Sequence, residues 1–378
     1  MTDAQAAALE KAACNHTQSQ AGAAALKKLE GAAQAGAPAA QYWLGGFFTC
    51  DRAHFSPAKG TDWHRKAAAQ GFVNAQFILG VEYYQGRGVP QDYAKARYWW
   101  TKAAAQGLAQ AQFNLGMAYA RGYGVTRDYK EAADWYRKAA AQGLAQAQFF
   151  LGRSYREGRG VTRDYKKAAD WYRKAAVQGF VKAQFHLGVA YARGRGVAQD
   201  YGKADYWYRK AAAQGLAQAQ YNLGVAYYKG QGVAQDYAKA IYWYKKAAAQ
   251  GFAEAQNTLG IGYYKGQGVA QDYAKAIYWY KKAAAQSLAS AQFNLGVSYY
   301  NGQGALKNYI KANYWWKKAA AQRFVDAQFA LGVQYYNGRG VPKDYAKARY
   351  WWTKAAVQGN RSAQRAIKLI ETGGASGH

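Results

Sequence analysis

The sequence is poor in proline and cysteine, and it contains no long apolar run. Only 4 of its 378 residues are proline and 2 are cysteine, whereas 42 are glycine. Two cysteines are too few for a small disulfide-stapled scaffold, and chain breaks must come mostly from glycine. No stretch approaches the roughly 18 apolar residues that a membrane-spanning helix needs. We therefore expect a soluble chain without a transmembrane segment.

Acidic residues are also scarce. The chain has 21 Asp and Glu against 51 Lys and Arg, which gives a formal net charge of +30. One explanation is a solvated basic face that keeps an apolar-rich protein in solution. A second is a surface that binds polyanions, and a third is an acidic protein partner. Composition alone leaves these three interpretations open.

The sequence also lacks a catalytic or metal-binding pattern. Its five histidines are scattered, with no pair at i, i+4 and no Cys–His spacing typical of zinc. We expect His186 to be a solvated side chain on the outer side of a helix. One set of aspartates recurs where helices should begin, and its members are predicted to be helix caps: Asp92, Asp128, Asp164, Asp200, Asp236, Asp272 and Asp344. We predict no cofactor, no metal and no enzymatic activity.

The sequence does have a repeat of 36 residues. A Leu-Gly pair marks each copy, at Leu79, Leu115, Leu151, Leu187, Leu223, Leu259, Leu295 and Leu331 and the glycine after each. A fixed period of this size indicates supersecondary units that stack on one another, each in contact mainly with its neighbours.

One copy, residues 216–251, predicts a pair of helices. We number its positions 1 to 36 from Leu216. Apolar and small residues at i, i+3, i+4 and i+7 predict a helix from Gln218 to Lys229, which the following glycines end. Asp236 then caps a second helix from about Tyr237 to Gln250. The predicted core stripe of this helix consists of Ala240, Trp243, Tyr244, Ala247 and Ala248, and tryptophans at the same position of other copies are assigned to the core as well: Trp99, Trp171, Trp207 and Trp279.

These residues resemble the Sel1-like repeat family, a relative of the tetratricopeptide repeat. The features that carry the resemblance are Ala219, Leu223-Gly224, Tyr227, Gly230-x-Gly232-Val233, Asp236, Lys239-Ala240, Trp243, Lys246-Ala247-Ala248 and Gln250-Gly251. The resemblance implies an all-α fold, a right-handed α/α superhelical solenoid of tandem helix–turn–helix repeats. It also implies a scaffold or adaptor for other proteins. Bacterial members are often exported and act at the envelope, in host interaction or beside secreted effectors.

The repeat divides the chain into four parts. Residues 1–71 are predicted to form two degenerate N-terminal copies that cap the array, and 72–359 form eight regular copies. Residues 360–371 are expected to add a C-terminal capping helix, followed by a flexible tail over 372–378. The N-terminus lacks the pattern of a signal peptide. The location is therefore open: periplasmic or secreted if a signal peptide has been removed, and cytoplasmic otherwise.

Cys14 and Cys50 occupy the same position in the first two copies. They are either two free thiols or a disulfide that staples the N-terminal cap. A disulfide would favour an oxidising compartment. The spacing does not choose between these alternatives.

The predicted partner-binding surface follows from comparing copies. Positions 3, 7, 11 and 14 of the first helix lie opposite the core stripe at 100° per residue, and they vary while the stripe barely changes. In the resembling family the first helices line a concave groove. The predicted contact residues are Ile78, Glu82, Asn114, Arg121, Phe150, Glu157, His186, Arg193, Asn222, Lys229, Thr258, Lys265, Asn294, Asn301, Gln334 and Asn337.

We expect a protein partner in this groove, such as an acidic, effector or envelope protein. The alternative is a polyanion-binding solenoid that uses a basic convex face, with a nucleic acid or an anionic surface polymer as ligand. Nucleic acid is disfavoured, because Asp134 and Asp170 stand where other copies carry an outward tyrosine. The pattern says nothing of the oligomeric state.

Overall fold

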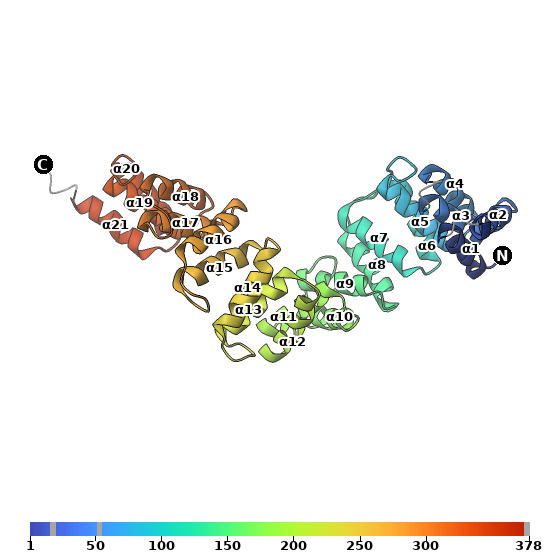
Figure 1. Ribbon diagram of the computed structural model, residues 1–378, viewed down its shortest axis with the longest axis horizontal. Helices are drawn as coiled ribbons and strands as arrows, with labels where there is room; N and C mark the ends of the chain where they lie inside the picture. The colour runs from blue at the N-terminus through green and yellow to red at the C-terminus, as the bar shows by residue number, and fades with distance from the viewer. Residues whose placement is uncertain (16–19, 51–54, 374–378) are drawn as a thin grey trace. The chain divides into compact units, whose positions relative to one another are not determined.

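The fold is a tandem series of helices. The computed structural model describes residues 1–15, 20–50 and 55–373, and in these ranges every regular element is an α-helix. The helices, in chain order, are α1 (Asp3–Asn15), α2 (Gln20–Gln34), α3 (Pro38–Cys50), α4 (Pro57–Ala69), α5 (Val73–Gln85), α6 (Tyr93–Ala105), α7 (Ala109–Arg121), α8 (Tyr129–Ala141), α9 (Ala145–Glu157), α10 (Tyr165–Val177), α11 (Val181–Arg193), α12 (Tyr201–Ala213), α13 (Ala217–Lys229), α14 (Tyr237–Ala249), α15 (Ala253–Lys265), α16 (Tyr273–Ala285), α17 (Ala289–Asn301), α18 (Tyr309–Ala321), α19 (Val325–Asn337), α20 (Tyr345–Val357) and α21 (Arg361–Gly373). The predicted all-α solenoid of 36-residue helix pairs is confirmed (Figure 1).

Local capping explains where the helices begin and end. Asp236 Oδ1 accepts a hydrogen bond of 2.8 Å from the backbone N–H of Lys239, which satisfies one of the unpaired donors at the start of α14. All seven repeated aspartates cap a helix in this way, as predicted, and Asn308 does so where the aspartate is replaced. Gly230, at φ +66°, ends α13 in a left-handed conformation that suits glycine.

Two units make up the chain. The first comprises Met1–Ala190 and Gly194–Ala198, and the second comprises Tyr191–Arg193 and Gln199–His378. Within each unit the first helix of a copy packs against the second helix of the same copy and against the second helix of the preceding copy, as α15 does against α16 and α14. A first helix is therefore flanked on two sides.

A leucine and an aromatic residue form the core of each regular copy. The leucine at position 8, Leu223 in the copy 216–251, is fully buried in all eight copies. Tyr244 at position 29 is also buried, at 3% exposure. A Cβ atom on Gly224 would lie 2.4 Å from the ring of Tyr244, so this position of the helix interface accepts only glycine. The prediction for Trp243 is only partly correct, because this residue and its equivalents are half-buried at the edge of the core.

Glutamine side chains join neighbouring copies. Gln220 is buried and donates a hydrogen bond to the carbonyl of Ala212 in the preceding copy. Gln250 Nε2 in turn donates a 2.8 Å hydrogen bond to Gln220 Oε1. The same pair of positions is bonded in seven further copies: Gln41 and Gln70, Gln76 and Gln106, Gln112 and Gln142, Gln148 and Gln178, Gln256 and Gln286, Gln292 and Gln322, and Gln328 and Gln358. Buried polar atoms need partners. The bond from Gln220 to Ala212 crosses a repeat boundary, whereas the bond between Gln220 and Gln250 lies within one copy.

The chain ends are closed by extra helices. At the N-terminus, α1, α2 and α3 pack together around buried Leu29 and Phe47. Cys14 on α1 is disulfide-bonded, and the side chain of the other cysteine, Cys50, lies outside the described residues. At the C-terminus, Asn360 caps α21, which continues to Gly373 rather than ending before residue 372. The remainder of the predicted tail, from residue 374, lies outside the described residues.

Candidate functional site

The predicted contact residues fall into three environments. Those at position 14 are exposed at the end of the first helix, apart from Glu157, which is half-buried: Arg121, Arg193, Lys229, Lys265, Asn301 and Asn337. Those at position 7 are half-buried: Ile78, Asn114, Phe150, His186, Asn222, Thr258 and Asn294. Glu82 and Gln334, at position 11, are 4% and 2% exposed.

The prediction that position 11 faces away from the core is therefore wrong. Glu82 lies in the interface with α4, where its Oε1 is 2.7 Å from His64 Nδ1. In the α14–α15 interface Gly262 occupies the same position, and a Cβ there would lie 2.5 Å from Ile241 Cδ1. Position 11 thus contacts the second helix of the preceding copy, which a helical wheel for a single copy does not include.

Position 7 packs on the position-29 aromatic of the preceding copy. The ring of Phe150 lies 5.6 Å from that of Tyr136, and His186 lies 5.4 Å from Tyr172. His186 is therefore not the solvated side chain that the sequence predicted. Burial, and then the charge of Arg156, lower the pKa of His186 to about 4.

A small pocket recurs at the junction between consecutive copies. We call it a junction pocket: it lies beside the position-29 aromatic or histidine and is lined by position 10 of the copy that follows. Four examples have volumes of about 140, 170, 260 and 280 Å³. Their floors are His64, Trp100, Tyr136 and Tyr244. Several predicted contact residues line them, namely Ile78, Glu82, Asn114, Arg121, Glu157, Thr258 and Lys265.

The junction pockets differ in chemistry. The pocket between α14 and α15 measures about 280 Å³ and is lined by Tyr228, Ile241 and Ile261, with Lys265 as its cationic residue. The pocket between α6 and α7 is also aromatic and apolar, because Tyr84, Trp100 and Phe113 line it. Similar geometry with different side chains would let neighbouring pockets accept different groups.

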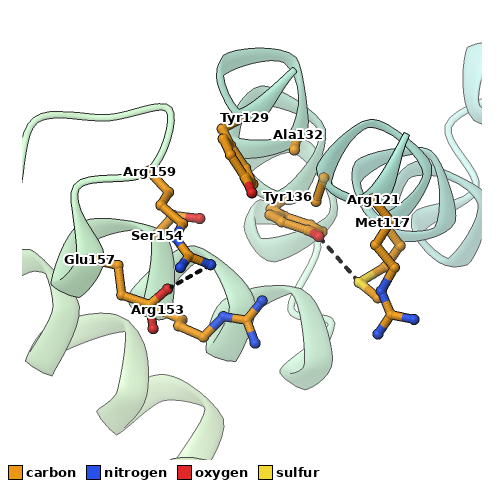
Figure 2. A pocket seen from close by; sticks show the side chains of 10 residues that line it. Met117, Arg121, Tyr129, Ala132, Tyr136, Arg153, Ser154, Glu157 and Arg159 are labelled. Carbon is orange, nitrogen blue, oxygen red and sulfur yellow. Dashed lines mark hydrogen bonds and ion pairs between the residues drawn. The ribbon is translucent and has the colours of Figure 1, made fainter. Parts of the chain in front are cut away.

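The pocket between α8 and α9 is the basic one (Figure 2). It measures about 170 Å³, and Arg121, Arg153 and Arg159 line it together with Glu157 and Tyr136. Arg121 comes from the end of α7, and Arg153 comes from α9 on the other side of Tyr136. The Tyr136 hydroxyl donates to Met117 Sδ over 3.2 Å, and burial raises the pKa of this phenol above its usual range.

The charges of this pocket do not balance. Glu157 is already paired with two arginines, Arg156 and Arg159. Arg153 lies 4.6 Å above the ring of Phe150, and among the described residues it has no hydrogen-bond or ion-pair partner. A half-buried guanidinium without an acceptor leaves several N–H donors available for an anion.

Positions 10, 13 and 29 line the pockets, although the sequence did not predict them as contact positions. The signal was present at position 10, which is valine, isoleucine or methionine in seven regular copies and arginine only at Arg153. Position 13 is tyrosine in five copies but alanine at Ala120, beside the basic pocket. These departures become informative once the structure shows that the two positions face each other across a junction.

Comparison with protein families identifies the repeat. The Sel1 repeat model matches nine consecutive segments: 38–72, 73–108, 109–144, 145–180, 181–216, 217–252, 253–288, 289–324 and 325–360. The chain belongs to the Sel1 repeat family. The first of the nine Sel1 repeats coincides with α3 and α4, within the segment that the sequence analysis assigned to the N-terminal cap.

Solved structures of Sel1 repeat proteins resemble this chain over most of its length. A protective antigen of uropathogenic Escherichia coli is 36% identical, with 92% of this chain and 90% of that chain covered and a TM-score of 0.57. A Sel1 repeat protein from Oxalobacter formigenes is 34% identical, with 82% and 90% covered and a TM-score of 0.67. A comparison with curated proteins returned no match.

Two further observations concern metal and membrane. In the part of the chain that the structure describes, His, Cys, Asp and Glu side chains form no group of three or more suited to a metal ion. Within the same ranges, no helix combines the length and apolarity needed to cross a lipid bilayer.

Proposed function

We propose that this Sel1 repeat protein is a non-enzymatic scaffold that binds a protein partner along its first helices. The observation that carries the proposal is the recurrence of junction pockets with different linings. A partner segment that lies across successive first helices would place one side chain in each pocket it crosses. Specificity would then come from the order of the pockets along the chain.

The exposed ends of the first helices would contribute polar contacts around these pockets. Lys229 and Lys265 are exposed cations at position 14, whereas Asn301 and Asn337 are exposed amides at the same position. Such residues at the rim of an interface mainly set orientation and on-rate, while the half-buried pocket residues supply most of the affinity.

Substitutions borrowed from other copies can test this proposal with little risk to folding. Thr258→Phe, which introduces the residue of Phe150, fills the pocket between α14 and α15, and Lys265→Asn introduces the residue of Asn301. The control changes the opposite side of the repeat: Lys245→Thr with Lys281→Thr introduces the residue found at Thr101 and Thr353.

The assay is capture of partners from a lysate, followed by identification and titration of a purified partner. We expect the pocket pair to weaken binding by about tenfold or more, as loss of a central contact does. The control pair should change affinity by less than about twofold at moderate salt. The proposal is wrong if only the control pair reduces binding.

A second candidate function has one specific observation in its favour. In the second unit, five consecutive repeats carry an exposed tyrosine at position 27 with a lysine Nζ 4.6–4.9 Å above its ring: Tyr206, Tyr242, Tyr278, Tyr314 and Tyr350. The interrupting residues, Asp134 and Asp170, belong to the first unit. A periodic row of aromatic rings and cations suits an anionic polymer.

Salt dependence separates the two candidates. If this row binds a polyanion, affinity for heparin or single-stranded DNA falls steeply with salt, and Tyr242→Asp with Tyr278→Asp weakens it. These variants introduce the residue of Asp134 and Asp170 and leave the junction pockets unchanged. A shallow salt slope, or no effect of the aspartates, would count against polyanion binding.

A further inference from the structure

The basic junction pocket between α8 and α9 departs from the commonest residue of the repeat on both of its sides: Arg153 is unique at its position, and Ala120 shares its residue type only with Ala192. Position 10 on one wall is apolar in seven regular copies and is Arg153 here. Position 13 on the opposite wall is tyrosine in five copies, and in the copy 72–107 that ring covers the floor, with Tyr84 lying 5.7 Å from Trp100. In the basic pocket Ala120 takes its place, so the side chain that would cover Tyr136 is missing.

Both departures cost stability, and they have a common effect on the surface. Replacing an apolar wall residue by a half-buried arginine costs desolvation energy, and replacing tyrosine by alanine removes packing. Together they create a pocket of about 170 Å³ that contains a guanidinium without an acceptor. When a copy departs from the commonest residue at two facing positions and gains no packing by it, the departure is expected to serve function.

We propose that this pocket binds a carboxylate from an acidic segment of the protein partner. Arg153 presents a planar fork of donors that matches a carboxylate, with Arg121 on the other side of the pocket. Glu157 is held by Arg156 and Arg159, so it does not neutralise Arg153. A monoanion suits the site better than a dianionic phosphate, because Glu157 also lines the pocket and repels additional negative charge.

The neighbouring pocket extends the recognition to a second residue. Met117 lines both the basic pocket and the aromatic pocket between α6 and α7, so the two are adjacent. Tyr84, Trp100 and Phe113 line that second pocket, which suits an aromatic or aliphatic side chain. The ligand is therefore an acidic residue followed or preceded by an apolar one, which favours a peptide over a free carboxylic acid. This inference rests on the proposed function, and it specifies that the partner segment carries an acidic residue beside an apolar one.

The test uses variants that restore the repeat's own residues. Arg153→Val introduces the residue of Val81 and four other copies, and Ala120→Tyr introduces the residue of Tyr84. Both should fold at least as well as the parent chain. The matched control is Arg163→Gln, which removes an exposed arginine in the same copy and introduces the residue of Gln91, Gln199, Gln235 and Gln271.

The probe is a short fluorescent peptide of Glu-Glu-Phe units, with a Gln-Gln-Phe peptide as its neutral counterpart. In physiological salt we expect Arg153→Val to weaken binding of the acidic peptide by about tenfold or more, the effect of losing a charged hydrogen bond. Ala120→Tyr should weaken it by about as much, because the new ring covers Tyr136 and fills the pocket. Arg163→Gln should weaken it by less than about twofold, since one exposed charge of many is screened. The neutral peptide should bind the parent chain about tenfold more weakly than the acidic one.

Two outcomes would overturn the inference. Equal losses for Arg153→Val and Arg163→Gln would show that the acidic peptide senses only the diffuse positive charge. Displacement of the peptide by inorganic phosphate at millimolar concentration would show a general anion site rather than a carboxylate site. Neither outcome decides the scaffold proposal, because that proposal is tested by the Thr258 and Lys265 variants, which lie in the second unit.

Discussion

Arg156 Nη1 lies 3.0 Å from Nδ1 of His186, whose ring stacks on that of Tyr172. Phe149 covers the imidazole as well, at 5.6 Å between ring centres. The neutral imidazole can accept a hydrogen bond from the guanidinium, whereas a protonated one would be repelled by it. This copy therefore holds its histidine in the neutral form.

The first prediction is a loss of stability in mild acid that depends on His186. Its pKa falls from 6.5 to about 4 on folding, so the unfolded chain binds the proton more tightly. The contribution of neutral His186 to the free energy of unfolding is fully present above pH 6.5 and is lost as the pH falls toward about 4. Since one pKa unit corresponds to about 1.4 kcal/mol, the loss is at most about 3 kcal/mol.

His186→Asn is the matched variant, because Asn114, Asn222 and Asn294 occupy the same position in other repeats. Urea unfolding of both proteins between pH 7 and pH 4 measures the difference. The variant should show a flatter pH dependence in this window. Burial and the charges of Arg156, Arg153 and Lys182 favour the neutral ring, while Glu157 opposes them. Parallel curves would mean that their sum does not hold His186 neutral.

The second prediction concerns backbone strain at the end of two repeats. Ser287 and Arg323 have φ values of +63° and +64°, where eight other copies place a glycine at positive φ. A side chain in this region costs about 1–2 kcal/mol, part of which the flexibility of glycine in the unfolded chain offsets. Arg323→Gly should therefore raise the free energy of unfolding by about 0.5–1 kcal/mol.

Gly251→Ser provides the reverse change. A Cβ on Gly251 meets no atom within 4 Å, so only the backbone conformation opposes it. This variant should lose about as much stability as Arg323→Gly gains, measured by urea unfolding. If both variants unfold like the parent chain, the positive φ values store no strain.

The third prediction tests the glutamine pairs. Gln220→Met keeps the volume of the side chain but leaves the amide of Gln250 without its acceptor and the carbonyl of Ala212 without that donor. We expect a loss of about 1–2 kcal/mol, typical of a polar group left unsatisfied at a buried site. Gln218→Met makes the same change on the exposed side of α13 and should cost less than about 0.5 kcal/mol. Equal costs would assign the effect to helix propensity rather than to the bond.

The fourth prediction concerns the N-terminal helices. Cys14 on α1 is disulfide-bonded, and removing such a bond typically costs 2–4 kcal/mol. Reduction or Cys14→Ser should speed amide hydrogen exchange of Leu29 and Ala33, which share the N-terminal core, and leave that of Leu295 unchanged. Peptide mapping without reductant identifies the partner cysteine. Identical exchange with and without reductant would show that the bond does not support this part of the fold.

The periodicity of the sequence predicts the fold well, because each copy repeats the same caps, glycines and core residues. The bounds of α13 and α14 follow from Gly230 and Asp236 to within a residue. The candidate site was predicted less well. A helical wheel gives each helix one buried side, whereas a first helix is buried against two neighbours, and this is why Glu82 and Gln334 are inside.

The junction pockets could not be predicted from one copy for a related reason. A pocket depends on which side chain is missing from the opposite wall, as Ala120 shows, and on which residue faces it from the next copy, as Arg153 shows. These positions lie 33 residues apart in the sequence and meet only when the copies stack. The sequence shows that Arg153 departs from the other copies. The effect of this arginine on the pocket is clear only when the preceding copy, with Ala120, is placed against it.

The buried glutamines bear on how a gene of this kind can evolve. Each such junction offers the same donor and acceptor, as Gln220 and the carbonyl of Ala212 show, whichever copies meet there. A crossover between misaligned copies that inserts or deletes 36 residues would re-form those bonds at the new boundary. A single recombination event can therefore add, delete or relocate a binding position such as that of Arg153, while the stacking contacts remain intact.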